Sequence, residues 1–161
     1  MDVSEQMLNG KGDTPRLDEI DVKILKELLN NARLSNRQIA ARVGVSVGTV
    51  ISRIKRMEDE GIIKGYTTIL DHEKLGYELT VVTEVTVSKG KLLETEREIA
   101  KNPNVCAVYD VTGEVDVIVI AKFKNRRELS KFTKSLLAMP FVERTNTRVV
   151  LTTIKEDFKL L

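Results

Sequence analysis

Apolar residues in the first half of the chain recur at the three- and four-residue spacing of amphipathic helices, and they predict three short helices. The first helix is expected over residues 17–33, the second over 35–43, and the third begins at residue 46. The apolar face of the first helix is formed by Leu17, Ile20, Ile24, Leu25 and Leu28. Residues 62–70 are rich in β formers and predict a strand. That strand is either a wing on the helical domain or an arm that leads to a second domain.

From residue 77 onward the pattern changes to segments of two-residue alternation separated by helical segments. The expected elements are strands at 79–88, 105–112, 115–124 and 142–154, and helices at 91–102 and 126–139. The order strand, helix, strand, strand, helix, strand is that of a ferredoxin-like βαββαβ domain. Such a domain has a four-stranded antiparallel sheet with two helices on one face.

The face of this sheet without helices is expected to be apolar. It would show Val82, Val108, Ile118 and Ile120, or the residues that alternate with them. A face of this kind is too apolar to remain in contact with water. We therefore expect a homodimer in which a second copy of the chain covers it.

The second and third helices are joined in the manner of a helix-turn-helix motif. Ser35 and Gln38 form a capping box at the start of the second helix, and Ser46 caps the third. Residues 43–45 make the turn, in which Gly44 fits a position that often needs a positive φ. In such motifs the second helix enters the major groove of DNA. The predicted fold class is α+β, with an N-terminal winged helix-turn-helix domain and a C-terminal ferredoxin-like domain.

The surface of the third helix divides into a small, hydroxylated half and a cationic half. The first half can approach base edges closely, and the second can meet phosphate. Residues 28–57 contain six basic residues and no acidic one, although the whole chain has a net charge of only +2. The candidate DNA-facing residues are Ser46, Gly48, Thr49, Ser52, Arg53, Lys55 and Arg56, with Arg37 and Arg42 on phosphate. An ordinary charged surface helix is the alternative, and the caps, turn and charge together favour DNA binding.

Composition limits the other classes of protein to which this chain could belong. The 161 residues are 42% hydrophobic and 31% charged, which indicates a soluble globular chain. No apolar run is long enough to span a membrane and no secretory signal is evident, so a cytoplasmic protein is expected. Cys106 and His72 are single and far apart, which excludes an internal disulfide and gives no credible zinc site or other metal or cofactor site. We expect a flexible lead-in at 1–15, the helix-turn-helix domain at 16–66, a strand or linker at 67–76 and the ferredoxin-like domain at 77–161.

Residues 17–156 resemble the Lrp/AsnC family, also called feast/famine regulators. The resemblance is carried by Leu17-Asp18-Glu19-Ile20-Asp21, by Val43-Gly44-Val45-Ser46, by the run from Arg53 through Tyr66, and by the turn Thr112-Gly113-Glu114-Val115-Asp116. It implies a transcriptional regulator, often of amino-acid metabolism and often responsive to a small amino acid. It also implies assembly beyond the dimer, such as a tetramer of dimers.

The resemblance places the effector at an interface between dimers, near the glycine turn. The residues that match are Gly113, Glu114 and Asp116, with Arg148, Val149 and Val150 and the weaker neighbour Thr147. A glycine turn exposes backbone N–H groups that can hold a carboxylate, and Asp116 could pair with an ammonium group. A plain hairpin turn and a surface ion pair are the alternatives.

Two other functions compete with an effector-responsive regulator. An architectural DNA-packing protein would show weak sequence preference, strong salt dependence and no amino-acid response. A packing protein would usually be far more basic than this chain. An enzyme is the third possibility, because Asp110, Glu114 and Asp116 are close in sequence. No nucleophile, metal shell or phosphate loop accompanies these carboxylates, so we expect no enzymatic activity.

Overall fold

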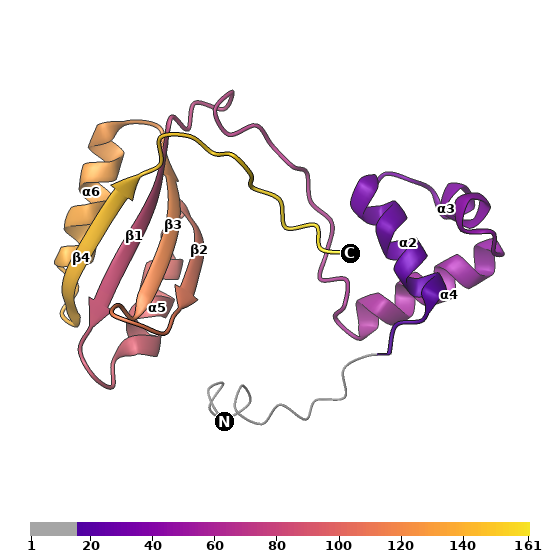
Figure 1. Cartoon of the computed structure of the whole chain (residues 1–161), viewed down its shortest axis with the longest axis horizontal. Helices are drawn as coiled ribbons and strands as arrows, with labels where there is room; N and C mark the ends of the chain where they lie inside the picture. The colour runs from indigo at the N-terminus through magenta and orange to yellow at the C-terminus, as the bar shows by residue number, and fades with distance from the viewer. Residues whose placement is uncertain (1–15) are drawn as a thin grey trace. The chain divides into compact units, whose positions relative to one another are not determined.

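A computed structural model describes residues 16–161, so the lead-in predicted at 1–15 lies outside the described residues. The chain divides into two compact units. One unit reaches Thr68 and also takes Asp157–Leu161, and the other is Ile69–Glu156. The first holds the helices α2, α3 and α4, and the second holds the sheet (Figure 1).

The helical unit begins with three helices: α2 (Glu19–Asn30), α3 (Asn36–Val43) and α4 (Val47–Asp59). Local sequence signals fix the starts of α3 and α4 and the end of α3 as predicted, whereas α2 is shorter than the predicted 17–33. Ser35 and Gln38 form the capping box of α3, and Ser46 caps α4. Gly44 ends α3 with φ 79° and ψ 37°, a left-handed conformation that glycine adopts without steric cost.

The apolar faces of these helices meet in one small core. Its buried members are Ile24, Leu25, Ile39, Ala40, Val50 and Met57. Ile62 and Ile63, which follow α4, also pack against it. The segment that follows α4 therefore contributes to the core of the helical unit.

The strand predicted at 62–70 does not form in this structure. A strand needs a neighbouring strand to accept its hydrogen bonds, and the residues that the structure describes provide none here. Ile62 and Ile63 serve the helical core instead, while Ile69 and Leu70 are exposed. β propensity alone therefore misidentified a connecting segment.

The sheet unit contains β1 (Leu79–Val87), α5 (Leu92–Ala100), β2 (Val105–Asp110), β3 (Val117–Phe123), α6 (Arg126–Leu137) and β4 (Val142–Val149). The strand order is β2-β3-β1-β4, and every neighbouring pair is antiparallel. This is the predicted ferredoxin-like arrangement. β4 ends at Val149 rather than at residue 154, and beyond it the backbone N–H of Val150 still donates to the carbonyl oxygen of Thr80.

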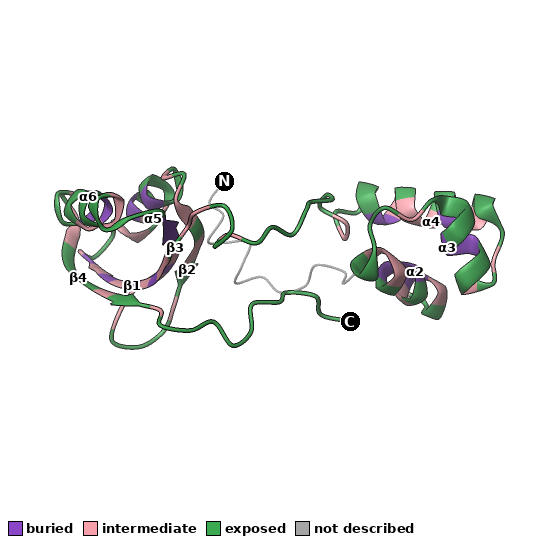
Figure 2. Cartoon of the chain, turned by 90° about the horizontal axis from the view of Figure 1, so that it is seen from above, coloured by how far each residue is buried: buried purple, intermediate pink, exposed green. Residues whose placement is uncertain are grey.

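Both helices cover the same face of the sheet (Figure 2). They enclose an apolar core formed by Val81, Val85, Val87, Ile99, Val117, Val119, Ala121, Phe123, Phe132 and Leu136. Phe123 and Phe132 lie with their ring centroids 5.1 Å apart. This core is larger than that of the helical unit.

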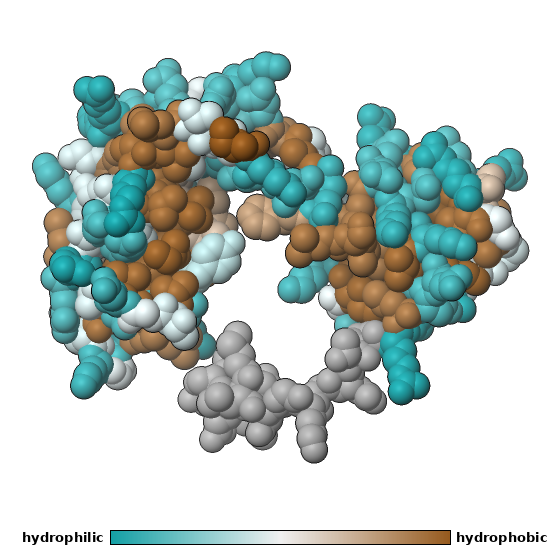
Figure 3. Space-filling view, in the orientation of Figure 1, coloured by the Kyte–Doolittle hydropathy of each residue, from teal (hydrophilic) through white to brown (hydrophobic). Residues whose placement is uncertain are grey.

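The other face of the sheet is open and partly apolar (Figure 3). The register pairs Val82 with Ile120 and Tyr109 with Ile118, so these four side chains share it. Val108 was expected on this face, but it pairs with the buried Val119 and packs into the core. The prediction was wrong at Val108 because a register shift between Val105 and Ala107 changes which residues of β2 face the helices.

Candidate DNA-binding and effector sites

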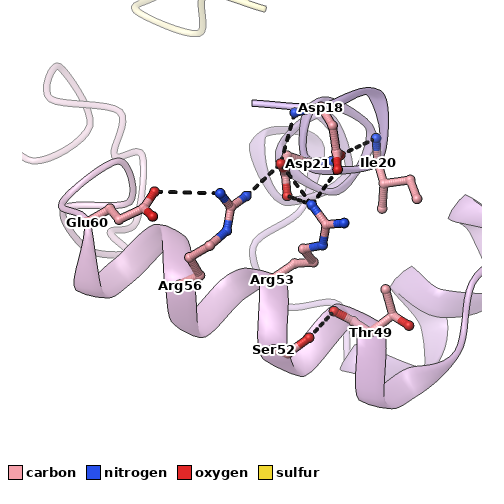
Figure 4. A network of polar contacts seen from close by, with 8 residues as sticks. All are labelled: Asp18, Ile20, Asp21, Thr49, Ser52, Arg53, Arg56 and Glu60. Atoms are coloured by element: carbon pink, nitrogen blue, oxygen red, sulfur yellow. Dashed lines mark hydrogen bonds and ion pairs between the residues drawn. The ribbon is translucent and has the colours of Figure 1, made fainter. Parts of the chain in front are cut away.

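The N-terminal half of α4 presents a row of small hydroxyl groups. The Ser46 hydroxyl accepts the backbone N–H of Thr49 at 3.0 Å, and the two side-chain oxygens lie 2.8 Å apart. Ser52 donates to the carbonyl oxygen of Thr49 at 3.0 Å (Figure 4). All three side chains are fixed by local bonds and remain at least partly exposed, so they form an ordered polar surface.

Gly48 lies in the middle of this surface. A Cβ atom added there would meet nothing closer than the Ser46 hydroxyl, at 3.8 Å. The packing of the chain therefore does not require a glycine, and glycine in a helix costs up to about 1 kcal/mol relative to alanine. A surface with no side chain at this position allows the helix backbone to approach another molecule closely.

The C-terminal half of α4 is bound to α2 by ion pairs. Arg53 lies 2.5 Å from the carboxylate of Asp18 and 3.2 Å from that of Asp21. Arg56 lies 2.6 Å from Asp21 and 3.8 Å from Glu60 (Figure 4). The side chain of Asp21 has no exposed surface, so it is a buried carboxylate held by two arginines.

The same two carboxylates also cap α2. Asp18 accepts the backbone N–H groups of Ile20 and Asp21, and Asp21 accepts that of Asp18. The backbone N–H of Asp21, and then Arg53, hold the pKa of Asp18 below its usual value. In return, the hydrogen bond to Asp18 raises the pKa of Arg53. Cap and ion pairs thus form a single network.

Arg53 and Arg56, which the sequence places on the DNA-facing surface, thus already have partners within the chain. Their charged groups are turned toward α2 instead. Arg42 is also paired, with Glu27 at 2.8 Å. Among the described residues no ion pair involves Arg37 or Lys55, and both are exposed. The sequence pattern gave no sign that Asp21 is a buried anchor for two arginines.

In the sheet unit, the predicted effector turn connects β2 to β3. Gly113 has φ 128°, which strongly favours glycine. Gly113 and Glu114 are exposed. The carboxylate of Asp116 accepts the backbone N–H of Val87 at 2.7 Å, so one of its oxygens already has a partner within the chain. Asp116 therefore secures the turn to the end of β1.

The other predicted effector residues lie on β4 and just beyond it. Arg148 pairs with Glu84 on the open face of the sheet, and this contact holds the pKa of Glu84 below its usual value. Thr147 shares a hydrogen bond with Thr83 at 3.0 Å. Val149 is 46% exposed, and the backbone N–H of Val150 donates to Thr80.

Within one chain, the turn and the β4 residues are not brought together. Arg148 lies opposite Val82 of β1, whereas Asp116 is bonded to Val87. Five residues of strand separate these two levels, or about 16 Å at ~3.3 Å per residue. One chain therefore does not assemble both halves of the predicted effector site.

Tyr66 is a further feature of the helical unit. With α2 and α4 it lines an open groove whose other residues are Leu28, Ala32, Leu34, Asn36, Ile51, Ile54, Lys55, Glu58 and Asp59. Its hydroxyl donates to Glu58 at 2.9 Å. Burial and this bond raise the pKa of Tyr66 to about 12.

Two absences apply to residues 16–161. No group of three or more His, Cys, Asp or Glu side chains is placed to hold a metal ion. No helix among them has both the length and the apolar character needed to cross a membrane.

Comparison with known proteins identifies the two units. The model of winged helix-turn-helix DNA-binding domains matches residues 17–64, and that of the Lrp/AsnC ligand binding domain matches residues 80–160. The chain belongs to the Lrp/AsnC family. It is a transcriptional regulator with a helix-turn-helix DNA-binding domain and an Lrp/AsnC ligand-binding domain.

Similar proteins support this assignment along almost the whole chain. An uncharacterized HTH-type transcriptional regulator of Pyrococcus furiosus is 50% identical, covering 89% of this chain and 97% of the relative. The HTH-type transcriptional regulator Ptr1 of Methanocaldococcus jannaschii is 34% identical, with coverages of 89% and 98%. A Neisseria meningitidis transcriptional regulator, solved as a complex with L-Met, has a TM-score of 0.83 and 31% identity over 91% of this chain and 97% of that one.

Proposed function

We propose that this Lrp/AsnC regulator reads DNA through the N-terminal half of α4, with Ser46, Gly48, Thr49 and Ser52 toward base edges. The observation that carries the proposal is Gly48, which the chain's own packing does not require. Lys55 and Arg37, which are exposed and take part in no ion pair among the described residues, contact phosphate. The paired residues Arg42, Arg53 and Arg56 have no base-reading role in this proposal.

Selection of binding sites from random DNA tests this arrangement. The wild type is expected to select a near-palindrome, since identical half-sites suit a dimer. Thr49→Val removes a hydroxyl while keeping the shape of the side chain, so the selected sequence should change. Ser130→Ala, at an exposed position of α6, is the matched control and should leave the selected sequence unchanged. An identical site for Thr49→Val would refute the role of Thr49 in recognition.

The second copy of the chain covers the open face of the sheet. Val82, Ile118 and Ile120 are only partly buried there, and Tyr109 is 46% exposed. Ile118→Asp places a charge in the centre of this face and should produce monomers in sedimentation velocity. Leu137→Asp changes another exposed apolar residue, on α6, and should leave the dimer intact. Equal sedimentation of the two variants would exclude this interface. Assembly beyond the dimer follows from the family resemblance alone.

The ligand of the C-terminal domain is a small amino acid. The L-Met complex of the similar Neisseria regulator supports this class. Because one chain keeps the two groups of residues apart, the site joins Gly113, Glu114 and Asp116 of one chain to Thr147–Val150 of another. Since Asp116 already accepts Val87, its second carboxylate oxygen is the one that meets an ammonium group.

Thermal melting against each of the twenty amino acids tests the ligand. A ligand at one hundred times its Kd stabilises the protein that binds it by about 2.7 kcal/mol. A rise in Tm with one or two amino acids is expected, and it should be lost in Glu114→Gln or Arg148→Gln. No shift with any of the twenty would favour the effector-independent architectural protein. On this proposal the protein acts in the cytoplasm on double-stranded DNA, with no enzymatic activity.

A further inference from the structure

The ion pairs between α2 and α4 bear on how the regulator distinguishes its own site from other DNA. Every lysine or arginine that contacts phosphate adds affinity for DNA of any sequence. α4 carries three basic residues, Arg53, Lys55 and Arg56. Two of them are directed at Asp21, and only Lys55 is without an ion pair among the described residues.

We infer that Asp21 is a specificity-determining residue that withholds Arg53 and Arg56 from the DNA backbone. Its side chain is fully buried and lies within 3.2 Å of both guanidinium groups. Moving an arginine away from a buried carboxylate is costly, because the carboxylate would be left without a partner in a medium that solvates it poorly. Phosphate on the DNA must therefore compete with Asp21 for these two arginines, and with Asp18 for Arg53.

The contrast with Arg42 supports this role. Arg42 is 53% exposed and pairs with Glu27, which keeps 26% of its side chain exposed. A pair of that kind is weak in water and opens readily beside a stronger anion. Arg53 and Arg56 keep only 31% and 35% of their side chains exposed, around a carboxylate with none. The withheld cations are thus distinguished from an ordinary surface pair by the burial of their partner.

As a consequence, the binding of α4 to DNA depends more on the hydroxyl groups of its N-terminal half than on the positive charge of its C-terminal half. This inference rests on the proposed DNA-binding surface of α4. It assigns Asp21 a positioning role as well, because the same contacts fix α4 against α2. The two roles are separable, since positioning affects the strength of binding while withheld charge affects its dependence on salt.

The salt dependence of binding to random duplex DNA provides the test. The slope of log K against log salt changes by about 0.9 for each phosphate contact. Lys55→Gln should therefore reduce the slope by about 0.9 per chain. Arg53→Gln should leave it unchanged, and the chain still folds because Arg56 remains on Asp21. Asp21→Asn should steepen the slope by up to about 1.8, and random DNA should gain affinity relative to the selected site.

Glu58→Gln is the control for Asp21→Asn. It also removes one negative charge from the helical unit, but Glu58 accepts a tyrosine hydroxyl rather than an arginine, so no cation is released. The slope of log K against log salt for this variant should stay within ~0.3 of the wild-type slope, about a third of one phosphate contact.

Three outcomes are distinguishable. Equal losses of slope in Arg53→Gln and Lys55→Gln would overturn the inference, because Arg53 would then contact phosphate in the wild type. A folded Asp21→Asn with weaker binding and an unchanged slope would also overturn it and leave Asp21 a structural anchor only. A wild type that does not bind duplex DNA would instead refute the proposed function. If Asp21→Asn does not fold, the comparison of Arg53→Gln with Lys55→Gln decides.

Discussion

The helical unit and the sheet unit hold their elements together in different ways. In the sheet unit, α5 and α6 cover a continuous apolar core that includes the fully buried Phe123. In the helical unit the apolar core is smaller, and α4 is additionally fixed to α2 by arginines around a buried carboxylate.

The difference follows from what each unit must leave exposed. A recognition helix presents much of its surface to DNA, so only a narrow apolar stripe is left for packing. Apolar packing is not directional, whereas a hydrogen-bonded ion pair fixes the rotation of a helix about its axis. Charge therefore sets the orientation of α4, and burial supplies the stability of the sheet.

Phe123→Ala is the strongest way to break the apolar side of this comparison. Truncating a buried phenylalanine typically costs 3–5 kcal/mol, so the free energy of unfolding should fall by about 4 kcal/mol. Phe158→Ala is the matched control, because Phe158 is 81% exposed and its loss should cost less than about 0.5 kcal/mol. Urea denaturation followed by circular dichroism measures both. Similar losses of unfolding free energy in the two variants would show that the apolar core of the sheet unit does not supply its stability.

Asp21→Ala tests the ionic contacts of the helical unit, because it removes the carboxylate that holds α4 to α2. The buried carboxylate receives one backbone N–H and two arginines, so its removal should lower the free energy of unfolding by about 2 kcal/mol. Glu19→Ala is the control in the same turn of α2, where the side chain is exposed, and should cost less than about 0.5 kcal/mol. Thermal melting distinguishes the two. Equal losses would show that Asp21 acts only through helix propensity.

The sequence could reveal the structural features that depend on residues close to one another along the chain. The caps Ser35 and Ser46 are predictable because a cap bonds to a residue two or three positions away. The order of elements followed from periodicity, since each helix or strand buries one of its faces. Both signals are local, and both are confirmed.

The errors concern contacts between distant parts of the chain. Asp21 meets Arg53 and Arg56, which lie 32 and 35 residues further along, and no local pattern indicates such a pairing. The expected strand at 62–70 required a partner strand, and the side of the sheet on which Val108 lies depended on a register shift. The sequence of α4 likewise does not indicate that a buried carboxylate elsewhere in the chain engages two of its arginines.

Gly48→Ala sharpens the comparison within α4 itself. Because a methyl group fits there, the variant should be more stable than the wild type by about 0.5 kcal/mol. Its affinity for the selected DNA site should nevertheless fall, since the methyl group keeps the helix backbone away from the bases. Gly61→Ala is the control: space is available at Gly61 too, but φ is 70°, so alanine should destabilise the protein. Unchanged DNA affinity in Gly48→Ala would remove the main support for the proposed reading surface.

The smallest expected effect is the pH dependence contributed by Asp18. Its pKa is lower in the folded protein than its ordinary 3.8, so its contribution to stability is present above pH 3.8 and is lost as the pH falls through the folded value. Asp18→Asn keeps the helix cap, because asparagine caps as well as aspartate does, and removes only the charge. The Tm of the wild type should therefore exceed that of the variant slightly at pH 7, and the gap should close below pH 3.8. It should also narrow at high salt, because Asp18 is exposed and salt screens its attraction to Arg53. A gap that is the same at pH 7 and pH 3 would show that the charge of Asp18 is not its source, leaving the buried Asp21 as the group that fixes α4 by charge.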